Sequence, residues 1–157
     1  NVEDLKDRGI VSGKGDGKYD PTGTLTKAEI LKIALEANAK AENLVEHPEE
    51  DHWAEQAGYV ARAEELGLAF DTDLDEPATR GYVLYLLTEA GEIDVGEYDS
   101  IGFPDVEVNH EYAFDIENSR LQEWVSGDGD TGNFRPDDNL NRAEVAKIVE
   151  KFIESFE

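Results

Sequence analysis

Several features are missing from this sequence of 157 residues, and each absence excludes a class of structure or chemistry. Cysteine is absent, which excludes disulfide bonds, thiolate nucleophiles and cysteine-based zinc sites. No run of 18 apolar residues occurs, so the sequence predicts no membrane-spanning helix. A basic N-terminal region and a signal peptide are also lacking. A secreted chain has the same appearance after processing, so this last absence does not locate the protein.

Positive charge is scarce. The chain has 14 Lys and Arg residues against 38 Asp and Glu residues, a net charge of −24. Such a surface repels nucleic acid and anionic membranes, so neither is expected as a partner. Three explanations of the acidity stay open: it holds divalent cations, it keeps a crowded or salt-bathed surface soluble, or it is a solvated coat.

No catalytic motif is visible. The three histidines, His47, His52 and His110, do not form an H-E-x-x-H pattern, and no nucleophile motif occurs. Acidic residues are too abundant for any pair to stand out as an acid–base couple. The sequence therefore predicts that the chain is not an enzyme and has no catalytic residues.

One loop–helix unit recurs along the chain. Its fullest form spans residues 125–152, a second copy spans 11–37, and a shorter copy spans 69–90. In the first two copies the loop is rich in glycine and aspartate and ends in an aromatic residue, one further residue and proline. A shared loop of this kind indicates internal repetition.

The helices that follow the loops share their pattern. They align on a basic residue near each helix start: Lys27, Arg80 and Arg142. Apolar residues stand three, six, seven and ten positions later: Ile30, Val83 and Val145; Ile33, Leu86 and Ile148; Ala34, Leu87 and Val149; Ala37, Ala90 and Phe152. This spacing is typical of a helix with one buried face.

Capping signals mark the helix starts. Thr26 with Glu29, and Asn141 with Glu144, have the spacing of capping boxes, and Thr79 is a candidate N-cap. Predicted helices cover residues 2–8, 27–40, 52–66, 80–90 and 111–124, and a last one begins at residue 142. We find no convincing strand beyond two residues beside the loops.

The predicted fold class is all-α, in a single domain of tandem repeats. Residues 1–41 form repeat one, 50–92 repeat two and 103–157 repeat three. Each repeat consists of a helix, a loop and a helix, and none has enough apolar surface to fold alone. The three must therefore pack their helices together.

The motifs of the repeats resemble those of the S-layer homology (SLH) domain. The matching pieces are FPDV at 103–106, HWA at 52–54, GIVSG at 9–13, DGKYDP at 16–21, GNFRP at 132–136, LTKAE at 25–29 and LNRAE at 140–144. Three departures stand out. Repeat one lacks its F-x-D-V and H-W-A elements, repeat two has lost most of its loop and reads TRGY at 79–82, and repeat three has VNH at 108–110 in place of H-W-A.

The resemblance implies a pseudo-threefold helical bundle of the SLH spindle type, located outside the cell in the cell wall or surface layer. It also implies a partner, an anionic secondary cell-wall polysaccharide that is often pyruvylated and binds in grooves between repeats. Other surface-layer subunits are further candidate partners, and insertion into a membrane is not expected.

The basic residues at the helix starts are the first candidate ligands. Lys27, Arg80 and Arg142 each stand where the helix dipole disfavours a cation by about 0.3 to 1 kcal/mol. Free N–H groups together with a cation make an anion site, which suits a sugar carboxylate or pyruvate ketal. Arg can grip a carboxylate with two bonds, so Arg142 and Arg80 rank above Lys27. The alternative is that each cation pairs with a protein carboxylate, for instance Arg142 with Asp138.

Aromatic residues are the second candidates. Trp53 is the fourth predicted ligand-binding residue, since its ring can stack on a sugar. The same holds for Trp124, Tyr19, Phe134 and Tyr82. The alternative for each of these aromatics is a place in the core or an anchor for a loop.

The aspartate-rich loops raise a metal hypothesis. Asp128 and Asp130 alternate with glycine in the way that suits calcium, although residues 128–139 do not form an EF-hand loop. No other cofactor is predicted. The alternative is that aspartate and glycine simply build turns here.

Two functions are consistent with these observations. The first is a non-catalytic module that binds wall polysaccharide and anchors a surface protein. The second is a structural surface-layer or assembly module, with calcium as a candidate cofactor, that has kept the fold without binding glycan. They differ in whether Arg80 and Arg142 line an open groove or are tied into acid pairs.

Overall fold

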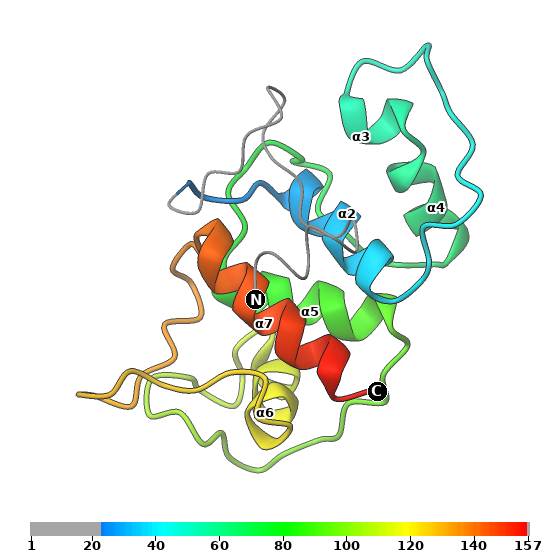
Figure 1. Ribbon diagram of the computed structural model, residues 1–157. Coiled ribbons are helices and arrows are strands. Elements are labelled where there is room, and N and C mark those ends of the chain that lie inside the picture. The colour runs from blue at the N-terminus through cyan, green and yellow to red at the C-terminus, as the bar shows by residue number, and fades with distance from the viewer. Residues whose placement is uncertain (1–22, 157) are drawn as a thin grey trace.

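The computed structural model describes residues 23–156 and is helical, as predicted (Figure 1). Its elements are α2 (Lys27–Ala37), α3 (Trp53–Gln56), α4 (Tyr59–Glu65), α5 (Arg80–Ala90), α6 (Ala113–Leu121) and α7 (Arg142–Glu154). Within this part of the chain no strand is formed, and only isolated bridges pair Thr24 with Asn141, Thr26 with Pro77 and Thr79 with Asn139. The all-α prediction is confirmed. The helix predicted at residues 2–8 lies outside the described residues.

The helix starts follow the predicted capping chemistry. Thr26 and Glu29 form a complete capping box at α2, and Asn141 and Glu144 form another at α7. The hydroxyl oxygen of Thr79 accepts from the backbone N–H of Tyr82 at the start of α5. Short polar side chains therefore set the first turn of each of these three helices.

Three predicted helices differ in their bounds. The helix expected at 111–124 is α6, which ends at Leu121, and Glu123 just beyond it takes a left-handed conformation with φ of 64°. The helix expected at 27–40 ends at Ala37, because Asn38 bonds back to the carbonyl of Ala34 and Ala39 takes a left-handed conformation with φ of 57°. The helix expected at 52–66 is divided into α3 and α4 at Gly58, whose φ of 96° is incompatible with a continuous helix.

One continuous apolar core joins the helices. Helix α5 contacts both α2 and α6, and α2 also contacts α3 and α4 (Figure 1). The predicted apolar stripes face this core: Ile30, Ile33 and Ala34 in α2, Val83, Leu86 and Leu87 in α5, and Val145, Ile148 and Val149 in α7 are all buried. The assignment of residues 1–41, 50–92 and 103–157 to three repeats, and the pseudo-threefold symmetry of the bundle, stay predictions.

The break at Gly58 gives a matched pair of glycine variants. A Cβ on Gly58 would meet the carbonyl oxygen of Val45 at 2.5 Å, whereas a Cβ on Gly67, whose φ is 72°, meets nothing within 4 Å. Gly67→Ala should lower the free energy of unfolding by about 1–2 kcal/mol through backbone strain alone. Gly58→Ala should lower it further through the added clash, as measured by urea unfolding. Equal losses in the two variants would show that the chain relaxes around residue 58.

Candidate functional site

The three predicted cationic ligands are buried. Lys27 is 8% exposed, Arg80 8% and Arg142 3%. Each is the first residue of its helix, as the sequence predicted. Each also contacts a segment that lies far away in sequence, so the three helix starts connect distant parts of the chain.

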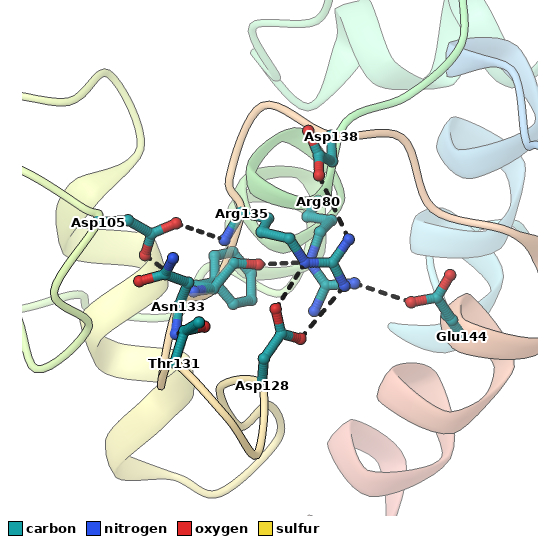
Figure 2. A network of polar contacts seen from close by, with 9 residues as sticks. Arg80, Asp105, Asp128, Thr131, Asn133, Arg135, Asp138 and Glu144 are labelled. Carbon is teal, nitrogen blue, oxygen red and sulfur yellow. Dashed lines mark hydrogen bonds and ion pairs between the residues drawn. The ribbon is translucent and has the colours of Figure 1, made fainter.

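Arg80 connects α5 with the segment before α7 (Figure 2). Its Nε donates to the carbonyl of Phe134 at 2.7 Å, and its Nη1 donates to Oε2 of Glu144 at 2.9 Å. The guanidinium also lies 4.8 Å from the centroid of the Phe134 ring, within cation–π range. Glu144 uses its other oxygen to accept from the backbone N–H of Asn141. One glutamate therefore completes the cap of α7 and neutralises the cation that begins α5.

Arg142 repeats this arrangement. Its Nη2 donates to Oε2 of Glu29, while Oε1 of Glu29 accepts from the backbone N–H of Thr26. Arg142 therefore pairs with a carboxylate, as the alternative expected, but the partner is Glu29 and not Asp138. The sequence signal was present in the K-A-E and R-A-E patterns, where we assigned the glutamate to the capping box alone.

Lys27 has a different set of partners. No glutamate is available at the third position of α5, because Tyr82 stands there. Instead Nζ of Lys27 contacts Asp71 at 2.5 Å and Glu76 at 2.6 Å, and lies 5.2 Å from the centroid of the Tyr82 ring. Two acids of the shortened loop, Asp71 and Glu76, thus take the place of the glutamate that repeat two lacks at residue 82.

The backbone contacts follow the same order as the ion pairs. The first N–H of α2, from Lys27, donates to the carbonyl of Glu76 at 2.9 Å. In α5 the backbone N–H of Arg80 donates to the carbonyl of Asp138 at 2.8 Å. In α7 the backbone N–H of Arg142 donates to the carbonyl of Gly23 at 3.0 Å. Each acceptor stands three residues before an N-cap. The start of α2 is bound to the segment before α5, that of α5 to the segment before α7, and that of α7 to the segment before α2. The contacts are therefore cyclic.

At the starts of α2 and α5 the predicted free N–H groups are not present, and the expectation was wrong for these two helices. In α2 the second N–H, from Ala28, donates to the carbonyl of Leu74, and in α5 that of Gly81 donates to Pro136. The third N–H of each helix is bonded to the N-cap side chain. Orphan donors of a helix start need partners, and here the neighbouring segment supplies them before any ligand arrives.

Asp105 of the FPDV motif fixes the loop that Arg80 contacts (Figure 2). Its two carboxylate oxygens accept from the backbone N–H groups of Phe134 and Arg135, both at 2.8 Å. Arg135 has a φ of 62°, so the loop turns sharply at this point. From the sequence this aspartate was expected only as part of a family motif, without a contact of its own.

His52 and His110 have matching roles. Nδ1 of His52 accepts from the N–H of Ala54 and its Nε2 contacts Asp75 at 2.8 Å. Nδ1 of His110 accepts from the N–H of Tyr112, and its Nε2 contacts Asp137 at 3.0 Å. The VNH segment therefore keeps the histidine of the H-W-A element while losing the tryptophan.

Trp53 is the one predicted ligand that is well exposed, at 42%. Its ring packs near His52 and meets Tyr59 edge-on at 6.3 Å. None of the contacts found among residues 23–156 joins it to Lys27, Arg80 or Arg142. Trp124, Phe134 and Tyr82 are buried, in agreement with the core alternative, and Tyr19 lies outside the described residues.

Of the two predicted calcium ligands, Asp128 is already in an ion pair with Arg135. Asp128 accepts from Nε of Arg135 at 3.0 Å and from Nη2 at 3.4 Å (Figure 2), while Asp130 is exposed. In the described part of the chain no three His, Asp or Glu side chains are grouped as metal ligands. Calcium at Asp128 would have to displace Arg135, and its binding stays a prediction.

Comparison with known proteins finds a family match over part of the chain. The sequence model of the S-layer homology domain matches residues 1–31 and 125–146, which include both complete loops and the helix starts that follow them. The matched segments make up less than half of the chain. No curated protein matches it. Over residues 23–156, no helix combines the length and the apolar character needed to cross a membrane.

The Arg142–Glu29 pair can be tested by a double-mutant cycle. Arg142→Met leaves a partly buried carboxylate without its cation and should lower the free energy of unfolding by about 3 kcal/mol. Glu29→Gln in the same chain should restore part of this loss, because glutamine keeps the capping contact and removes the charge. Lys147→Met, on the exposed side of α7, is the control and should change stability by about 0.5 kcal/mol or less. Additive losses in the urea-unfolding cycle would contradict the pairing.

The Lys27 contacts predict a pH dependence. The hydrogen bonds from Lys27 lower the pKa of Asp71 and of Glu76. A carboxyl with a lowered folded-state pKa stabilises the protein above its ordinary value, here 3.8 and 4.5, and loses that contribution as the pH falls further. The stability difference between wild type and Lys27→Met should therefore be largest at neutral pH and shrink below pH 4.5.

The control for this pH series is Lys40→Met, which removes a longer contact of 3.3 Å to Glu92 and should give a small difference that depends little on pH. Asp73 has the opposite effect on how the total stability changes with pH, because its hydrogen bond with Glu76 raises its pKa. Because Asp73 is present in both proteins, its contribution is reduced when the stability of Lys27→Met is subtracted from that of wild type. A difference that grows on acidification would contradict the assignment.

Proposed function

Taking the chain as a member of the S-layer homology family, whose domains are non-catalytic cell-surface modules, we propose that it binds an anionic secondary cell-wall polysaccharide and so anchors a surface protein. Pyruvylated polymers are the class we favour. The observation that carries the proposal is the family match over both loop–helix units. Such domains typically bind cell-wall polysaccharide. The net charge of −24 disfavours nucleic acid and anionic membranes, and it also repels an anionic polysaccharide from the bulk surface, so binding has to occur at local cations.

An anion at the predicted cationic ligands would compete with the carboxylates that already pair with them. These are Glu29 at Arg142, Glu144 at Arg80, and Asp71 and Glu76 at Lys27. Arg142 keeps a spare donor, since its Nε has no partner among the described residues. We therefore rank Arg142 and Arg80 before Lys27, which would have to lose two carboxylates. Trp53 is the exposed aromatic that would stack on a sugar ring.

A second function is favoured by the cyclic contacts. Because the three cations are already neutralised, they can serve the stability of the bundle without any glycan. The chain would then be a structural surface-layer or assembly module, with calcium at Asp128 and Asp130 as the candidate ligand. The two functions make different predictions about the isolated chain.

The test is binding to purified wall polysaccharide, with and without about 1 mM calcium, a concentration typical of extracellular calcium sites. The wild-type chain should bind saturably. The double variant Arg80→Lys and Arg142→Lys keeps both charges but loses the planar fork, and should bind at least about tenfold more weakly. Its circular dichroism and thermal midpoint show whether it is folded.

Trp53→Ala should weaken binding by a factor of about 10, the order expected for one stacking contact. Tyr98→Ala, at a partly exposed ring that packs on Phe114, is the matched aromatic control. A folded wild-type chain that binds no wall polymer under any condition would contradict anchoring. A calcium-dependent rise in the thermal midpoint, or calcium-dependent association, would then support the structural function.

A further inference from the structure

A cavity of about 550 Å³ lies between α4 and the loop over residues 42–47 (Figure 1). Its lining includes one arginine, two glutamates and an apolar wall: Arg62, Glu42, Glu65, Leu44, Val45 and Ala61. None of the four predicted ligand-binding residues is part of the lining. The volume falls within the range of small-ligand pockets. The cavity is therefore a candidate site separate from the helix starts.

The loop that walls the cavity is fixed at both ends. Nε of Arg62 donates to the carbonyl of Lys40 at 2.9 Å, and the backbone N–H of His47 donates to the carbonyl of Gln56 at 2.8 Å. Between these bonds the loop lies against Gly58, where a built Cβ would meet a backbone oxygen of the loop at 2.5 Å. The cavity is thus formed before any ligand arrives, which lowers the entropy cost of binding.

Arg62 differs from the other arginines that the structure describes. Those arginines each form an ion pair with Asp or Glu: Arg80, Arg120, Arg135 and Arg142. For Arg62 no ion pair is found within residues 23–156, although the chain has 38 acidic residues. Its Nε is used by the carbonyl of Lys40, and no bond is found in the same segment for Nη1 or Nη2. An arginine that is oriented at one edge and has donors left at the other suits a carboxylate.

The two glutamates give the lining both signs of charge. Glu42 and Glu65 are exposed, and neither is in an ion pair within the described part of the chain. A simple anion at Arg62 would be repelled by both glutamates. A metal ion is not indicated, since no three His, Asp or Glu side chains are grouped as ligands among residues 23–156. A ligand that carries both a carboxylate and an ammonium complements all three charges.

The rest of the wall is apolar. It includes Leu44, Val45 and Ala61. Val45 is 69% exposed, more than any other large hydrophobic side chain of the described residues. Covering such a side chain with an apolar group removes it from water and is favourable. Apolar surface beside charges of both signs matches the chemistry of an apolar peptide.

We propose that this cavity binds a short apolar peptide whose two termini are free. Arg62 binds the carboxylate, Glu42 and Glu65 bind the ammonium, and the apolar wall contacts the side chains of the peptide. Drug-sized ligands occupy pockets of about 300–1,000 Å³, so the volume suits a dipeptide. This site goes beyond anchoring to wall polysaccharide, because its ligand belongs to another chemical class.

The first experiment is a titration of the ¹⁵N-labelled chain with leucyl-leucine, followed through the amide shifts of Val45, Gly58 and Ala61. N-acetyl-leucyl-leucine and leucyl-leucine amide are titrated in parallel, because each keeps only one of the two charges. Saturable shifts at these amides with leucyl-leucine, about tenfold tighter than with either capped peptide, support the proposal, since each cap removes a charged hydrogen bond. Shifts confined to other residues, or equal binding of the three peptides, overturn it.

Two double variants with the same change in net charge isolate the cavity. Glu42→Gln with Glu65→Gln removes both acids of the lining, whereas Glu46→Gln with Glu64→Gln removes their neighbours in the loop and in α4, which do not line it. The first should weaken leucyl-leucine binding about tenfold, through the lost ammonium contacts. The second should weaken it less than about twofold, because exposed charges outside the cavity contribute little.

Binding of N-acetyl-leucyl-leucine, which has no ammonium, should not weaken in the first variant. Equal effects of the two double variants on leucyl-leucine would overturn the proposal, since they would reflect net charge alone. All four glutamates are exposed, so folding is retained and is checked by circular dichroism.

Discussion

The structure depends on finding partners for the first N–H groups of its helices. The first N–H groups of a helix have no partners within the helix, and burying them without partners is costly. Here the starts of α2, α5 and α7 receive carbonyl groups from the segments before α5, α7 and α2. A cation at each start then receives a carboxylate from the same neighbouring part of the chain. Helix capping and the association of distant segments are therefore one set of contacts.

This arrangement changes the meaning of the basic residue at each helix start. Taken alone, a cation beside a positive helix end suggests a waiting anion site. In the structure the unfavourable dipole is offset by Glu29 and Glu144, which each use one oxygen for their own helix and the other for the partner helix. Stability and ligand binding would compete for the same carboxylates.

Much of the fold could be predicted because it depends on local chemistry. The capping residues Thr26, Thr79 and Asn141 and the apolar stripes act within one or two turns, and both were found from spacing alone. The break at Gly58 was missed, since glycine inside a helical pattern does not reveal the sign of its φ. Candidate site residues were harder to interpret, because the partners of Lys27 lie 44 and 49 residues away. No local pattern identifies which of many acids will meet one cation.

The cyclic order of the contacts has a consequence for how such a protein can change in length. In an open solenoid each unit offers one free face, so units can be added at the end. Here the start of α7 is bound to Gly23, just before α2, which closes the series. Within residues 23–156 the carbonyls of Gly23, Glu76 and Asp138 are already bonded to a helix start, so a further loop–helix unit would have to displace one of them. Growth by single units is therefore disfavoured, and duplication of the whole set is the route that keeps every helix start satisfied.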